Sequence, residues 1–182
     1  MVSDIKNMFG RVDILVTSAG IGGLAFIQDM DDETWNNVID TNLTATFHTI
    51  REVSKVMIEQ GYGKIINISS MKSLLGTTKK GYSAYCASKG AINMLTKQCA
   101  AELAKYGITV NAIAPTFIKT DINAYLLDDP AFTKQLEDRI PVGRIGKFSD
   151  LVGLLLLFAS EASQFITGQI AYLDGGISAA QE

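Results

Sequence analysis

Cysteine is scarce in this chain of 182 residues, which contains only Cys86 and Cys99. If both lie on one helix, they are about 20 Å apart along its axis. A disulfide needs Cα atoms within roughly 7 Å, so these two thiols cannot pair within the chain. The sequence therefore favours a reducing compartment, and we expect a cytoplasmic protein.

Histidine is scarcer still, since His48 is the single one. Neither His48 nor the cysteines stand at a metal-ligand spacing, so we expect no metal site. A Ser-His-Asp site would have to use His48, and no motif surrounds it. We interpret His48 as a residue of a helix surface or an interface.

Strong charge bias and long apolar runs are also missing. The 16 basic and 19 acidic residues are scattered, with a net charge of −3, and form no basic stripe for nucleic acid. The longest strongly apolar run, residues 151–159, is far shorter than the ~20 residues that span a bilayer. The N-terminus has no charged lead before an apolar core, which predicts no secretory signal. We expect neither a nucleic acid nor a membrane as partner.

What is present suits one globular domain over residues 1–182, with 47% hydrophobic and 19% charged residues. Short apolar runs predict strands, and longer patterns between them predict helices. The expected strands cover 12–16, 64–68, 108–114 and 170–173; the expected helices cover 3–9, 31–60, 83–105, a segment starting near 130, and 151–159 with Ser149 as its cap. This alternation predicts an α/β fold with parallel βαβ units.

Small polar residues and glycines gather where the expected strands end. The loop from Thr17 to Gly23 follows the first strand, and Ser70 follows the second. In open α/β sheets this edge binds ligands, although plain turns have similar composition. Asn42 interrupts a long helical pattern, either as a tolerated exposed residue or as a kink that turns its amide inward.

Tyr85 and Lys89 are four residues apart, so they share one face of the helix 83–105. A nearby positive charge lowers the pKa of a phenol, ordinarily about 10, and allows proton exchange with an alcohol or a carbonyl. An ordinary amphipathic tyrosine beside a solvated lysine has the same spacing. Whether this pair is catalytic therefore has to be judged from the other residues of the chain.

Taken together, the marked positions resemble the short-chain dehydrogenase/reductase family from about residue 5 to residue 176. The positions that carry the resemblance are Asn42, Ser70, Tyr85-x-x-x-Lys89, Pro115 to Thr120, and Asp174-Gly175-Gly176. The resemblance implies the C-terminal part of a Rossmann-like, doubly wound parallel sheet with about four strands and helices on both faces. It also implies hydride transfer between NAD or NADP and an alcohol or ketone.

The resemblance assigns a role to each of these residues. Tyr85 is the implied general acid/base, and Lys89 lowers its pKa and hydrogen-bonds the nicotinamide ribose. Ser70 polarises the substrate oxygen, and Asn42 positions a water that connects Lys89 with solvent. The implied cofactor contacts are Ser18, Ala19, Gly20, Tyr85, Lys89, Pro115, Ile118 and Thr120.

Three departures from the family pattern stand out. Thr17-Ser18 replaces an Asn-Asn pair, so we expect a weaker connection between sheet and helix, and Thr116 replaces a glycine after Pro115. No strand with a glycine-rich pyrophosphate loop precedes Val12. This third departure predicts an N-terminally truncated domain without the cofactor-binding βαβαβ half, whose first strand is a bare apolar edge.

The segment 139–146, followed by Ser149-Asp150-Leu151, looks most similar to short-chain enzymes that act on sugar acids. Gluconate 5-dehydrogenases and 2-dehydro-3-deoxygluconate dehydrogenases are examples. A substrate carboxylate could pair with Lys72, Lys119 or Arg144, each of which is otherwise a solvated cation. We expect 116–146 to be a substrate lid and the loop 77–80 to reshape the mouth of the site.

Two alternatives remain open at this stage. One is a 3-oxoacyl-[acyl-carrier-protein] reductase, and the other is a non-catalytic oligomerising fragment that lacks a cofactor phosphate site. We also expect a homo-oligomer, a tetramer or dimer, that associates through helices 43–60 and 83–105.

Overall fold

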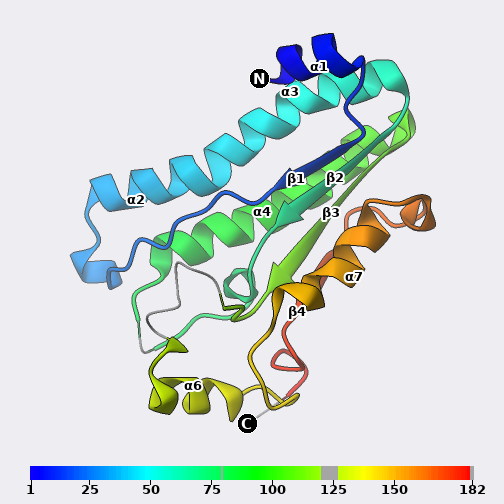
Figure 1. The fold of residues 1–182 in the computed structure, drawn as a ribbon. Coiled ribbons are helices and arrows are strands. Elements are labelled where there is room, and N and C mark those ends of the chain that lie inside the picture. The colour runs from blue at the N-terminus through cyan, green and yellow to red at the C-terminus, as the bar shows by residue number, and fades with distance from the viewer. Residues whose placement is uncertain (79, 120–126, 181–182) are drawn as a thin grey trace.

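A parallel sheet with the strand order β1-β2-β3-β4 forms the centre of the molecule (Figure 1). The computed structural model of the chain describes residues 1–78, 80–119 and 127–180. Its strands are β1 (Ile14–Thr17), β2 (Gly63–Ile68), β3 (Ile108–Pro115) and β4 (Ile170–Leu173). The expected α/β fold with about four parallel strands is confirmed.

The register places all carboxyl ends of the strands at one edge of the sheet. Thr17 lies opposite Asn67 across β1 and β2, and Ile68 lies opposite Ile113 across β2 and β3. Pro115 pairs with Leu173 at the end of β4. Segments that leave the strands here are therefore brought together although they are far apart in the sequence.

The helices follow the sequence pattern closely, with one correction. They are α1 (Val2–Phe9), α2 (Asp32–Ile39), α3 (Ala45–Gln60), α4 (Ser83–Leu103), α6 (Pro130–Glu137) and α7 (Phe148–Phe158). The expected cap at Ser149 is wrong, because α7 begins at Phe148 with Lys147 as its cap residue. The Asp150 carboxylate accepts the Lys147 backbone N–H at 2.7 Å, which places Ser149 inside the first turn.

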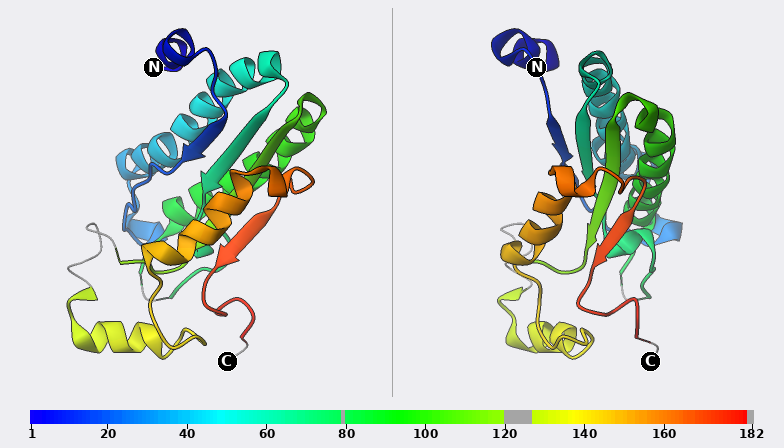
Figure 2. Two further views of the ribbon diagram at one scale, coloured as in Figure 1. Left: turned by 45° about the vertical axis from the view of Figure 1, so that its right-hand side comes forward. Right: turned by 90° about the vertical axis from the view of Figure 1, so that its right-hand side faces the viewer.

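Helices cover both faces of the sheet, as expected (Figure 2). Neighbouring residues of β2 point to opposite faces, as the strand alternation requires. Ile65 packs with Met57 of α3 and Val110 of β3, whereas Ile66 packs with Ile113 of β3 and Phe158 of α7. The two hydrophobic cores hold the sheet rigidly between α3 and α4 on one side and α7 on the other.

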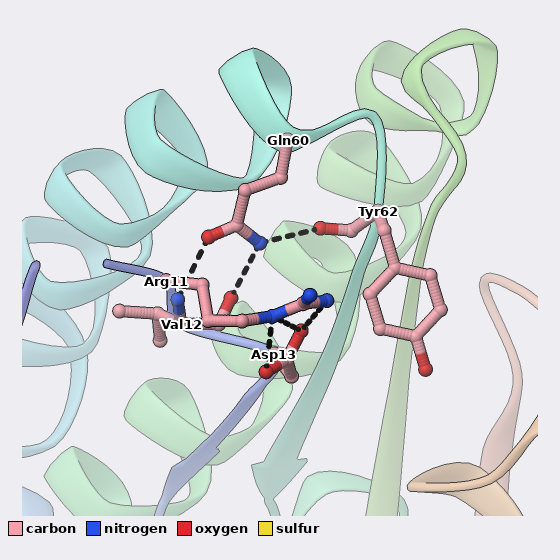
Figure 3. Close-up of polar contacts among 5 residues, drawn as sticks. All are labelled: Arg11, Val12, Asp13, Gln60 and Tyr62. Carbon is pink, nitrogen blue, oxygen red and sulfur yellow. Dashed lines mark hydrogen bonds and ion pairs between the residues drawn. The ribbon is translucent and has the colours of Figure 1, made fainter. Parts of the chain in front are cut away.

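The amino end of β1 is fixed to the end of α3 by a side chain (Figure 3). Gln60 accepts the Val12 backbone N–H at 2.7 Å, and its amide donates to the Val12 carbonyl at 2.9 Å. The same amide donates to the Tyr62 carbonyl at 3.2 Å. Arg11 pairs with Asp13 beside this contact. These bonds lie at the edge of the sheet opposite to the carboxyl ends.

None of the helices in the described ranges is both long enough and apolar enough to cross a membrane.

The buried Asn111 of β3 gives a test of the fold. Its amide donates to the Ile166 carbonyl at 2.8 Å and its oxygen accepts the Gln169 N–H at 3.0 Å. We expect Asn111→Ala to lower the free energy of unfolding by about 1–3 kcal/mol, because both backbone groups lose their partner. Urea titration measures this, and Asn37→Ala on the exposed face of α2 is the control, expected within about 0.5 kcal/mol of the parent. Equal stability of the two variants would contradict the assignment.

Candidate active site

Ser70 lies at the carboxyl edge of the sheet, just beyond β2. Its hydroxyl accepts the backbone N–H of Lys72 at 3.1 Å, which begins a short 3-10 turn over Met71–Ser73. Its carbonyl accepts the Ser73 hydroxyl at 2.6 Å. The turn thus fixes the hydroxyl where the second strand ends.

Tyr85 and Lys89 lie on the first turns of α4 and share a face, as the spacing predicts. The Lys89 ammonium lies 5.8 Å from the centre of the Tyr85 ring. It donates to the Ile68 carbonyl, the last of β2, at 2.9 Å. Only 4% of Lys89 is exposed. A single strand end therefore gathers Ser70, Tyr85 and Lys89.

Burial sets the proton affinities of this pair. It lowers the pKa of Lys89 to about 8, because the charged form loses its hydration. Burial also raises the pKa of Tyr85, and a hydrogen bond with the Ser70 side chain opposes this in part. The expected lowering of the Tyr85 pKa by Lys89 is wrong for these residues alone, since desolvation of the phenol outweighs its neighbours.

Asn42 lies in a π-helical turn, Asp40–Thr44, between α2 and α3. It is fully buried, and its amide donates to the Ile21 carbonyl and to the Ser88 hydroxyl, both at 3.0 Å. Its oxygen accepts the Ile21 N–H at 2.8 Å. The inward-turned kink is the correct interpretation, because the π turn rotates the amide between the loop after β1 and α4.

The loop residues Ser18, Ala19 and Gly20 are exposed at the end of β1. A Cβ added at Gly20 would lie 3.4 Å from both the Lys89 ammonium and the Asn42 side-chain oxygen. The lack of a side chain at Gly20 therefore leaves the loop backbone close to the Lys89 ammonium and the Asn42 amide. An ammonium and an amide are ordinary hydrogen-bond partners of hydroxyl groups.

Beyond β3, Pro115 ends the strand and Ile118 forms a bridge with Gly146. A cavity of about 250 Å³ opens here, with Thr116, Ile118, Gly146 and Asp174 in its walls. Thr120, the last expected cofactor contact, lies outside the described residues.

The threonine that replaces the first family asparagine still connects the sheet to α4. The Thr17 hydroxyl donates to the Asn67 side-chain oxygen at 2.8 Å, and the Asn67 amide donates to the Thr96 hydroxyl at 2.9 Å. A hydroxyl offers fewer hydrogen bonds than an amide. Asn67 supplies the contact to the helix.

Sequence reasoning missed Ser88 and Asn93. Ser88 is fully buried against Asn42. Asn93 accepts the Ser69 hydroxyl at 2.6 Å and donates to the Ser73 hydroxyl at 2.8 Å, so it braces both sides of Ser70. The signal was available, because Asn93 lies four residues after Lys89 and extends the face of Tyr85 and Lys89 by one turn.

Known proteins match this chain along almost its whole length. The family model described as "Enoyl-(Acyl carrier protein) reductase" matches residues 1–178. The 5-keto-D-gluconate 5-reductase of Escherichia coli is 40% identical over 97% of this chain and 68% of its own length. The protein belongs to the short-chain dehydrogenase/reductase family.

Two further relatives of this short-chain dehydrogenase/reductase are named after different substrate types. The 3-oxoacyl-[acyl-carrier-protein] reductase FabG of Staphylococcus epidermidis is 38% identical over 97% of this chain and 71% of its own. The crystal structure of a gluconate 5-dehydrogenase from Burkholderia cenocepacia, in complex with NADP and tartrate, has a TM-score of 0.94 and 38% identity, covering 99% of this chain and 70% of that one. The protein is thus an oxidoreductase of this family. These matches do not confirm the expected absence of an N-terminal half.

The low pKa of Lys89 predicts a pH dependence of stability. From about pH 8 to its ordinary pKa of 10.5, the folded chain has lost the Lys89 proton while the unfolded chain keeps it. The unfolded state then binds more protons, so this group makes the fold more stable as pH rises. In Lys89→Met we expect this contribution to vanish from the change in urea midpoint between about pH 7 and about pH 9.5.

Lys97→Met, on the exposed side of the same helix, is the control and should keep the parental pH dependence. An identical pH response in Lys89→Met would show that Lys89 titrates normally in the fold.

Proposed function

We propose that this protein interconverts a hydroxyl and a keto group of a sugar acid, with NAD or NADP as hydride carrier. The observation that carries the proposal is the meeting of Ser70, Tyr85 and Lys89 at the end of β2. Lys89 reaches the Ile68 carbonyl, and the Tyr85 phenol interacts with the Ser70 side chain. Two hydroxyls beside one buried cation suit proton transfer to or from a substrate oxygen.

The residues act on the oxygen of the substrate. Ser70 holds and polarises the carbonyl oxygen, and Tyr85 donates its proton to that oxygen as the carbonyl carbon receives hydride. In the reverse direction the alcohol proton returns to Tyr85. Because burial raises the pKa of Tyr85, the phenol starts protonated at neutral pH, which favours its role as acid in carbonyl reduction.

A nicotinamide cofactor supplies or accepts the hydride when bound. The short distance between Gly20 and the Lys89 ammonium supports this, since an ammonium beside an exposed loop can bind a ribose hydroxyl. Ser18, Ala19, Pro115 and Ile118 would line the rest of the cofactor. Thr120 stays a predicted cofactor contact outside the described residues. Asn42, held between Ile21 and Ser88, would position a water next to Lys89.

The names of the relatives support a sugar acid as substrate. One relative is a 5-keto-D-gluconate 5-reductase, and a structural neighbour is a gluconate 5-dehydrogenase with bound tartrate, a hydroxy acid. We further propose that 116–146, of which 116–119 and 127–146 are described, covers the substrate. Free thiols at Cys86 and Cys99 suit the reducing cytoplasm.

Removal of the Tyr85 hydroxyl tests the acid/base role. Relative to the parent protein, we expect Tyr85→Phe to lower the rate of NAD(P)H-linked reduction of 5-ketogluconate by about 10²–10⁴-fold, because the proton donor is lost. Spectrophotometric assays with NADH and with NADPH measure this. Tyr106→Phe, an exposed residue far along the chain from Ser70, is the control and should retain activity. Full activity in Tyr85→Phe would exclude the proposed role.

The FabG relative favours reduction of a 3-oxoacyl thioester as the second candidate. Turnover of acetoacetyl-thioester without turnover of 5-ketogluconate would select it. A non-catalytic oligomerising role remains the candidate of another class. Micromolar binding in an NADH fluorescence titration of the 182-residue chain would exclude a purely structural role.

We also propose that copies of the chain associate through α3 and α4, as a dimer or tetramer. Both helices carry exposed apolar side chains, Phe47 on α3 and Met94 on α4. We expect Met94→Arg to shift the sedimentation coefficient toward the monomer, because a charge would be buried at the interface. Lys97→Met nearby is the control. An unchanged sedimentation coefficient in Met94→Arg would place the interface elsewhere.

A further inference from the structure

A cavity of about 170 Å³ is lined in part by Met71, Lys72 and Tyr82, which are close in sequence to Ser70 and Tyr85. Its walls come from the turn after Ser70, from Tyr82, from Thr116 and Phe117 beyond β3, and from α6, which lies across the carboxyl end of the sheet (Figure 1). The Tyr82 ring lies 6.0 Å from the Tyr85 ring, centre to centre. The cavity wall therefore includes an aromatic neighbour of Tyr85.

The charges in the walls of this cavity are all of one sign. Lys72, Lys80 and Arg139 line it, and no aspartate or glutamate is among its described lining residues. Most of the remaining wall is apolar, including Phe117, Phe132 and Leu136, which weakens screening by water. Among the described lining residues, the cavity therefore carries positive charge alone.

The other two cations expected to bind a carboxylate are already neutralised. Lys119 pairs with Asp128 at 2.8 Å. Arg144 holds Asp150 with two nitrogens, at 2.7 and 3.0 Å, and this pair lies at the second cavity. Binding a substrate carboxylate at either site would first break an ion pair.

Lys72 is placed differently. Its ammonium lies 5.7 Å from the centre of the Tyr82 ring and has a long contact, 3.4 Å, with the Gly76 carbonyl. Neither Lys72 nor Arg139 has an ion pair among the residues that the structure describes. Burial lowers the pKa of Lys72; interaction with Cys86 opposes this, and repulsion from Arg139 adds to it. Lys72 and Arg139 line the same cavity, so one anion can face both cations.

We propose that Lys72 and Arg139 bind the carboxylate of the substrate and so make the enzyme specific for keto and hydroxy acids. This inference rests on the proposed hydride-transfer function and adds the group by which the substrate is recognised. The backbone N–H of Lys72 bonds to the Ser70 hydroxyl, so the residue that holds the carboxylate also adjoins the residue that polarises the carbonyl. Lys80, which lies over the Phe132 ring at 5.6 Å, remains at the rim.

The test compares a charged and an uncharged substrate in Lys72→Met and Arg139→Met. For 5-ketogluconate we expect KM to rise about 10–100-fold in each variant with kcat within a few-fold, because one charge-assisted hydrogen bond is lost. For the amide of 5-ketogluconate, which lacks the carboxylate, we expect the variants and the parent to have equal KM. Calorimetric titration with D-gluconate gives a readout without turnover, and its affinity should fall by a similar factor.

Lys97→Met on α4 and Arg51→Met on α3 are matched controls, because both residues are exposed on helix surfaces. An unchanged KM for 5-ketogluconate in both cavity variants would overturn the inference. An equal loss for the acid and the amide would also overturn it, since the effect would then be general. If Tyr85→Phe is inactive, either of these results leaves the proposed function intact. The proposed function would be rejected if the parent protein turned over no keto acid.

Thermal unfolding of the variants separates binding from folding. Lys72→Gln and Arg139→Gln, which keep a hydrogen-bond donor, serve if the methionine variants are unstable. We expect them to be intermediate in KM for the acid, and parental values would again overturn the inference.

Discussion

The contact between the Lys89 ammonium and the Ile68 carbonyl is the interaction on which the site depends. It joins the long helix α4 to the end of β2, at the residue just before the two serines. The cation is buried, and this costs hydration free energy that the single carbonyl does not fully replace. An ammonium has three donors, and among the described residues Ile68 accepts one of them, so the other two are available to a ligand.

Around this contact, the polar side chains form a connected hydrogen-bond network. Asn42 and Ser88 connect the loop after β1 to α4, and Asn93 connects α4 to both Ser69 and Ser73. The segments that follow two strands, β1 and β2, therefore meet α4 in the same few hydrogen bonds. Movement of any one of these elements would displace the hydroxyls of the site. The polar side chains are buried because they lie between these packed elements.

The sequence predicted what depends on local periodicity and on family spacing. The shared face of Tyr85 and Lys89 follows from a four-residue interval, and the parallel sheet follows from alternating strands and helices. Asn42 could be interpreted in two ways, because a π turn has no clear sequence pattern and its amide is fixed by Ile21 and Ser88, distant residues.

Contacts between distant turns escaped prediction. From the sequence, Arg144 and Lys72 were equal candidates for binding a carboxylate. The structure shows that Asp150, at the start of α7, forms an ion pair with Arg144. The pKa of Tyr85 likewise depends on how much of α4 is covered by its surroundings, which spacing does not reveal. The start of α7 shows the same limit, since the Asp150 carboxylate accepts the N–H of Lys147, which makes Lys147 the cap residue in place of Ser149.

Thr116 and Ile140 are common to the walls of both cavities at the carboxyl edge. A single partition then separates the space beside Lys72 from the space beside Ile118. A larger side chain at either position would therefore take volume from both compartments at once.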